Sequence, residues 1–96
     1  MGMALGFTFD ARTSPVNITG TGTNVVAKAT AGTLAGVSVN TGGAGSIVLI
    51  DCGVTPNVTL ATIDTTAARS VNLYYLRFSK LCYTKTGTAD VTLALT

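Results

Sequence analysis

Residues branched at Cβ make up a third of this chain and limit what it can fold into. There are 18 Thr, 10 Val and 4 Ile, together 32 of the 96 residues. Such side chains lose rotamer freedom in a helix and fit the pleated surface of a strand. A chain of 96 residues also has room for only one hydrophobic core. The sequence therefore predicts a single all-β domain.

Strand-like segments recur about every 10 to 14 residues from residue 24 onward, separated by clusters of Gly, Asn, Asp and Thr that favour turns. This rhythm is typical of an antiparallel β-sandwich, either jelly-roll or Ig-like, with about seven strands. A small barrel is a further alternative, because the sequence does not reveal the strand order. The expected strands are residues 24–30, 33–40, 45–52, 57–64, 70–78, 80–85 and 88–95.

The first 23 residues are predicted to form an extended N-terminal arm or edge segment ahead of a sandwich domain at 24–96. Leu5, Phe7 and Phe9 alternate with Gly and Thr, as in a short strand. The start of the chain lacks the basic residues that open a signal peptide, so we expect no export signal. An arm of this composition can become ordered when it meets a neighbouring subunit.

Residues 66–81 fit two periodicities. Their apolar side chains recur at spacings of three and four, as on one face of a helix, and the segment contains neither Gly nor Pro. Val71, Leu73 and Tyr75 also alternate with other residues, as on a strand. We predict a strand, because the rest of the chain is strand-rich and the segment lacks Glu and Gln.

The balance of apolar and charged residues indicates that a partner covers part of the surface. Apolar residues make up 47% of the chain, charged residues only 10%, and the mean hydropathy is +0.50. A monomer this small has a large surface for its volume and normally carries more charge. Residues 47–50, Ile-Val-Leu-Ile, are apolar on both faces of their strand. They lie either at the centre of the sandwich or against another chain.

Groups that perform catalysis or bind metals are scarce. Glu, Gln, His and Trp are absent, which removes most of the side chains that transfer protons. Asp10, Asp51, Asp64 and Asp90 fall at strand ends or turns, where Asp bonds to the local backbone. They form no sequence cluster of the kind that a hard cation requires. The sequence therefore predicts no catalytic residue, no cofactor and no metal site.

The charge pattern argues against nucleic acid as a partner. Six basic and four acidic residues leave a net charge of +2. The basic residues are spread from Arg12 to Lys85 instead of clustering as they do along a row of phosphates. No stretch supplies the roughly 18 apolar residues that are needed to cross a bilayer. We expect neither nucleic acid nor a membrane as a partner.

Cys52 and Cys82 match neither a zinc pattern nor a CxxC redox motif. The preferred interpretation is two reduced thiols packed in the core of a protein made in a reducing compartment. A disulfide between neighbouring strands is the alternative.

Aromatic and arginine side chains are the best candidates for contacts with a partner. Successive large residues at 74–76 point to both faces of a strand, so at least one Tyr should face solvent or a partner. Interfaces favour Tyr and Arg at their anchors, although each residue alone could be an ordinary surface residue. The candidate interaction residues are Leu5, Phe7, Phe9, Arg12, Arg69, Tyr74, Tyr75 and Arg77.

Three stretches of the chain resemble a known family. Residues 29–51 read ATAGTLAGVSVNTGGAGSIVLID, residues 61–64 read ATID, and residues 86–93 read TGTADVTL. An opening AGxLxxVxVN strand, a Gly/Ala hairpin, a strand ending in Asp and a closing TGTADVT are similar to small β-rich proteins that decorate or cement the capsids of tailed bacteriophages. The resemblance covers about residues 25 to 95.

The resemblance implies a structural virion protein without catalytic activity. Proteins of this family bind the outside of an assembled capsid, commonly as trimers, and clamp neighbouring capsid subunits together. The implied partners are the major capsid protein and further copies of this chain. The implied location is the outer capsid surface of a virion assembled in the host bacterial cytoplasm. The alternatives are a head-fibre, neck or tail component and a glycan-binding β-sandwich module.

Overall fold

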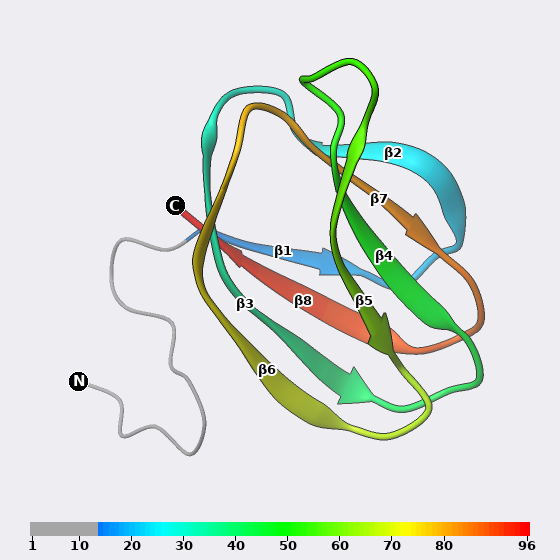
Figure 1. Ribbon diagram of the computed structural model, residues 1–96. Helices are drawn as coiled ribbons and strands as arrows, with labels where there is room; N and C mark the ends of the chain where they lie inside the picture. Colours follow the sequence, from blue (N-terminus) through cyan, green and yellow to red (C-terminus); the bar gives the residue numbers. More distant parts are fainter. Residues whose placement is uncertain (1–13) are drawn as a thin grey trace.

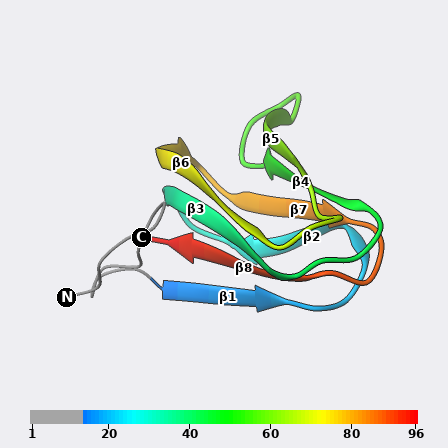
Figure 2. The same cartoon turned by 90° about the horizontal axis from the view of Figure 1, so that it is seen from below.

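The computed structural model describes residues 14–96, which form eight strands and no helix. The strands make two antiparallel sheets of four, packed face to face (Figures 1 and 2). The predicted all-β sandwich is confirmed, with eight strands where about seven were expected. The strands are β1 (Ser14–Ile18), β2 (Gly22–Lys28), β3 (Gly32–Thr41), β4 (Ser46–Asp51), β5 (Val58–Asp64), β6 (Arg69–Phe78), β7 (Leu81–Lys85) and β8 (Asp90–Leu95).

The strand order selects the jelly roll among the predicted architectures. Sheet A has the order β1-β8-β3-β6, and sheet B has the order β2-β7-β4-β5. The chain therefore pairs its first strand with its last, its second with its seventh, its third with its sixth, and β4 with β5. This is one long hairpin with its tip at β4–β5, rolled up so that successive pairs fall in alternate sheets. Such a double-sheet arrangement is a jelly roll.

β1 belongs to the sandwich, although the sequence analysis assigns its residues to the arm or edge segment. It is an edge strand whose regular ladder with β8 runs from Ser14↔Leu95 to Ile18↔Val91. The signal in the sequence is weak because only Val16 and Ile18 face the core and the partner strand lies at the other end of the chain. The other expected segments correspond to β2 through β8.

The core lies between the two sheets and is built from alternate residues of the central strands. In β8, for example, Val91, Leu93 and Leu95 are buried and face the opposite sheet, as their alternation predicts. β4 lies between β7 and β5 in sheet B, where Ile47 and Leu49 face the core and the alternate residues Val48 and Ile50 lie on the outer face. The principal buried side chains are Ile18, Leu34, Val37, Val39, Ile47, Leu49, Ile63, Phe78, Leu81, Ala89, Val91, Leu93 and Leu95.

Cys52 and Cys82 form a disulfide, so the prediction of reduced thiols is wrong. Cys82 lies on β7 opposite Ile50 of β4, and Cys52 follows the last residue of β4. The two Cα atoms are 5.9 Å apart. Nothing local in the sequence shows that these two strands are neighbours, because the residues that pair are about 30 positions apart.

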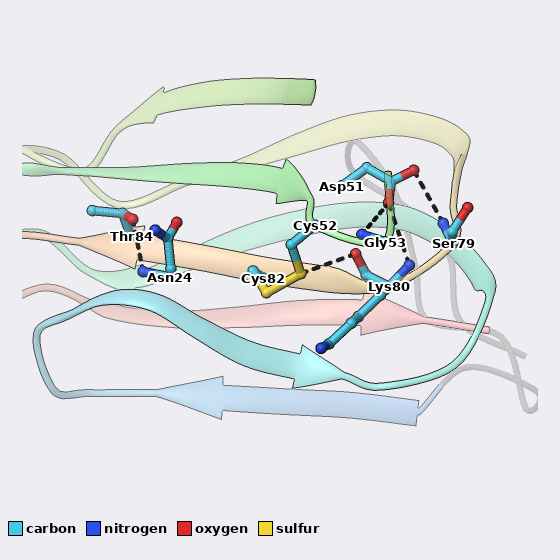
Figure 3. Close-up of a disulfide and its surroundings, with 8 residues drawn as sticks. All are labelled: Asn24, Asp51, Cys52, Gly53, Ser79, Lys80, Cys82 and Thr84. Carbon is cyan, nitrogen blue, oxygen red and sulfur yellow. Dashed lines mark hydrogen bonds between the residues drawn. A yellow bond between two sulfur atoms is a disulfide. The ribbon is translucent and has the colours of Figure 1, made fainter. Parts of the chain in front are cut away.

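Asp51 ties the end of β4 to the turn between β6 and β7 (Figure 3). Its carboxylate accepts hydrogen bonds from the backbone N–H groups of Gly53 at 3.0 Å, Ser79 at 3.1 Å and Lys80 at 3.3 Å. Burial raises the pKa of Asp51, but these three hydrogen bonds outweigh it and hold the pKa below its ordinary value of 3.8. The bond from Gly53, two residues ahead, confirms the prediction that Asp at a strand end bonds to local backbone, whereas Ser79 and Lys80 belong to a distant turn.

The β7–β8 turn depends on a glycine. Gly87 has φ +79°, in the left-handed region, and a Cβ at this position would collide with the carbonyl oxygen of Ala44 in the β3–β4 loop. The buried Lys85 side chain donates a hydrogen bond to the carbonyl oxygen of Gly87 at 3.1 Å. The two loops therefore meet closely at this end of the sandwich.

Candidate interaction surface

β6 is an edge strand with a large irregularity at its centre. Among the strands of residues 14–96 it pairs only with β3, where Leu34 lies opposite Leu76 and Gly36 lies opposite Asn72. One residue of β3 separates the first two positions, whereas residues 73–75 of β6 separate the other two. The extra residues form a bulge, which interrupts the ladder and redirects side chains. We call residues 73–75 the β6 bulge.

Tyr74 and Tyr75 in the β6 bulge both adopt left-handed backbone conformations, with φ of 53° and 60°. For a residue other than Gly, this region costs on the order of 1–2 kcal/mol because Cβ crowds the backbone. The Asn72 side chain supports the turn, since its Oδ1 accepts a hydrogen bond from the N–H of Tyr74 at 2.8 Å. Strain of this kind persists only where the surrounding structure enforces it, and it is concentrated at functional positions.

The β6 bulge exposes its two tyrosines, and the leucines on either side of them anchor the segment. Tyr74 is 82% exposed and Tyr75 is 49% exposed. Leu73 and Leu76, on either side, pack against the core. The expectation that at least one tyrosine faces outward is met by both. Two large aromatic side chains are therefore held on an edge strand, Tyr74 mostly uncovered and Tyr75 about half covered.

The structure brings both predicted arginines of the described region to the same strand. Arg69 begins β6, Arg77 precedes its last residue, and both are exposed. Arg69 lies close enough to Asp64 to influence the pKa of its carboxyl group. Hydrogen bonds from the Thr66 N–H and hydroxyl lower the pKa of Asp64 below its ordinary 3.8, and the positive charge of Arg69 lowers it further. The exposed Arg69 and Arg77 thus lie near the two ends of the strand that carries the tyrosines.

Half of the predicted interaction residues fall outside the region described. Leu5, Phe7, Phe9 and Arg12 precede Ser14, the first described residue. The site on β6 is therefore defined by Arg69, Tyr74, Tyr75 and Arg77.

A second surface, the outer face of sheet B, was not predicted from the sequence. The register places Val26, Cys82, Ile50 and Thr59 in one row across the four strands, and Val48 lies in the next row between threonines. Val26 is 48% exposed, whereas Ile50 and Cys82 in the same row are buried within the chain itself. These two rows contain no charged residue. The apolar segment at residues 47–50 indicated that the outer face of its strand is covered. It did not show which strands lie beside it.

The outer face of sheet A is polar and internally satisfied. Asn17 of β1 and Asn40 of β3 both donate through Nδ2 to Oδ1 of Asp90, at 2.6 Å and 3.1 Å, and both also donate to the Thr92 hydroxyl. Side-chain hydrogen bonds, first from Asn17 and then from Asn40, lower the pKa of Asp90. The two outer faces of the sandwich therefore differ, and the polar groups of sheet A are already occupied with one another.

Within residues 14–96, no group of three or more Cys, Asp, Glu or His side chains is placed to hold a metal ion. No helix in that same region is long and apolar enough to span a membrane. Comparison with protein families, with curated proteins and with solved structures finds no match to this chain.

Proposed function

We propose that this chain is a structural virion protein that binds the outside of a phage capsid and stabilises the shell by clamping neighbouring capsid subunits, as a homotrimer. The observation that carries the proposal is the β6 bulge. Two adjacent tyrosines are 82% and 49% exposed in strained backbone on an edge strand of the sandwich. Tyr and Arg are the residues that most often anchor protein interfaces. A strained, uncovered pair of this kind fits a contact with another protein.

Other observations agree with a binding role. The jelly roll is shared by many viral capsid domains, although the same fold also hosts unrelated functions, so the support is by analogy. The sequence resemblance to capsid decoration proteins gives the partner, the major capsid protein. The segment with Leu5, Phe7 and Phe9 is proposed to reach the shell or a neighbouring subunit.

A trimer supplies affinity that a single copy lacks. Once one subunit is bound, the other two meet their sites at a high effective concentration, so avidity exceeds the affinity of any one contact. A clamp of this type needs no catalytic group, and it can resist the outward pressure of packaged DNA by linking subunits that would otherwise separate.

The test combines solution size with copy number. Light scattering of the purified chain should give a trimer, and the chain should sediment with expanded capsids at hundreds of copies per particle. A monomer that does not bind capsids would refute the proposal. Six or twelve copies per particle would place the chain in the neck or a fibre instead of on the shell.

A glycan-binding module is the second candidate, favoured by the exposure of Tyr74 and Tyr75. Aromatic rings stack on sugars, and jelly rolls include lectins. A glycan array separates the two proposals, because a capsid clamp gives no hits and a lectin gives a defined set.

A further inference from the structure

The large apolar side chains that are exposed within residues 14–96 belong to two parts of the sandwich. Tyr74 and Tyr75 of β6 belong to sheet A and form the candidate site on that strand. The others are valines that are between 36% and 49% exposed, and each belongs to sheet B or to the loop between two of its strands. These are Val25 and Val26 of β2, Val54 of the β4–β5 loop and Val58 of β5.

The register connects these valines across sheet B. Val26 of β2 lies opposite Cys82 of β7, which lies opposite Ile50 of β4. Ile50 in turn lies opposite Thr59 of β5, the residue after Val58. One row of side chains therefore joins the two edge strands of the sheet, passing over the buried Ile50 and Cys82. We call Val26, Val54 and Val58, together with this row, the sheet B patch.

The charge of this face favours a second copy of the chain as its partner. The row that contains Val26 and the next row, where Val48 lies between Thr84 and Thr62, carry no charged side chain. When identical surfaces meet, charges of one sign repel their copies, whereas an uncharged surface of Val and Thr meets its copy without repulsion. A strongly charged partner would find no opposite charge in these rows.

The size of the face is sufficient for a stable contact. The domain measures 37 × 30 × 16 Å. An ellipse with the two longer axes has an area of about 870 Å², close to the roughly 800 Å² that a standard interface buries on each partner. A chain of this size with 47% apolar and only 10% charged residues also has the composition expected when a broad face is covered.

A copy seated on sheet B leaves the β6 bulge exposed. The outer face of sheet B points away from sheet A, which contains β6 at its edge (Figure 2). The outer face of sheet A is a poorer surface for an apolar contact, because Asn17 and Asn40 are hydrogen-bonded to Asp90 there. One molecule can therefore contact a further copy through sheet B and a different protein through Tyr74 and Tyr75.

We propose that the sheet B patch is the surface through which copies of this chain contact one another, while the β6 bulge of each copy remains exposed. In the proposed homotrimer, the three patches face one another around the three-fold axis. The biological meaning of this contact rests on the proposed function, which it deepens by assigning the contact between copies and the contact with the shell to different faces. Loss of the patch would leave each copy with one shell contact and no avidity.

The test is light scattering of the purified chain and of Val26→Asp over a range of concentrations. We expect the parent chain to be an oligomer and the variant to be a monomer, because each copy would bring a buried carboxylate into the contact. Val58→Asp repeats the test at the opposite edge of the sheet. Ser70→Asp places the same charge at an exposed position of sheet A and should leave the oligomer intact. Far-UV circular dichroism verifies that each variant folds.

Dilution of the parent chain tests the same contact without a substitution. The methyl resonances of Val26 and Val58 should shift as the oligomer dissociates, whereas those of Val37 in the core should not. A parent chain that is monomeric at every concentration would overturn the proposal, and so would an oligomer that survives both valine substitutions.

Cosedimentation with expanded capsids separates this proposal from the proposed function. A monomeric Val26→Asp should bind capsids at least roughly ten-fold more weakly than the parent chain, because avidity is lost. A valine variant that stays oligomeric but no longer binds capsids would mean that sheet B contacts the shell, which would overturn the proposal. If the valine variants dissociate as expected and even the parent chain does not bind capsids, the contact between copies is supported and the proposed function is refuted.

Discussion

Removing the Cys52–Cys82 bond should cost a large part of the stability of this small domain. The bond joins residues 30 positions apart, and a loop of that length in the unfolded chain corresponds to roughly 3.6 kcal/mol of lost conformational freedom. A domain of this size has an unfolding entropy of about 0.2 kcal/mol per kelvin, so the melting temperature should fall by about 18 °C. The ladder between β4 and β7 remains, so the reduced chain should still fold.

The assay is thermal unfolding followed by far-UV circular dichroism, with and without a phosphine reductant, on the parent chain and on Cys52→Ala/Cys82→Ala. The reduced parent and the double variant should melt at similar temperatures, well below the oxidised parent. The reductant should not shift the double variant. A drop of less than about 5 °C on reduction would refute the loop-entropy reasoning.

The remaining predictions concern pH, the turn glycine and the core. The pKa values of Asp51, Asp64 and Asp90 are lowered in the folded chain, so these carboxylates stabilise the fold fully above about pH 5 and lose this effect as pH falls below 3.8 through the folded values. Urea unfolding from pH 7 to pH 2 measures the change. A free energy of unfolding that does not vary with pH would contradict the prediction. Gly87→Ala should lower stability by at least about 1–2 kcal/mol, because Ala is strained at positive φ and meets the Ala44 carbonyl; unchanged chemical denaturation would refute it. Leu49→Ala empties a fully buried core position and should cost about 2–5 kcal/mol in the same assay, and a loss below 1 kcal/mol would show that the core collapses around it.

Strand content was predictable because it follows from local patterns. The alternation in residues 33–40 and 88–95 identifies β3 and β8, and the Gly-rich segment between 41 and 45 identifies the turn after β3. β1 was not predicted as a strand of the sandwich because it has only two core-facing side chains. Its strand partner, β8, lies at the far end of the chain. Tertiary pairing, not propensity, makes it a strand.

The site was predictable only in part, for a related reason. Adjacent tyrosines in a strand imply that one faces outward, and this led to Tyr74 and Tyr75. The bulge that exposes both depends on the register between β3 and β6, which local sequence does not specify. The disulfide likewise depends on β4 lying beside β7. Both features are products of the jelly-roll topology, so they appear only once the strands are arranged.

The variant Tyr74→Gly/Tyr75→Gly decides whether the two strained tyrosines have the proposed role of holding other subunits. Glycine adopts positive φ without strain, so the free energy of unfolding should be unchanged or higher by about 1 kcal/mol. Cosedimentation of the same variant with expanded capsids should fall at least ten-fold, with Ser70→Ala on the same strand as the control. A glycine variant that binds capsids as well as the parent chain would contradict the account.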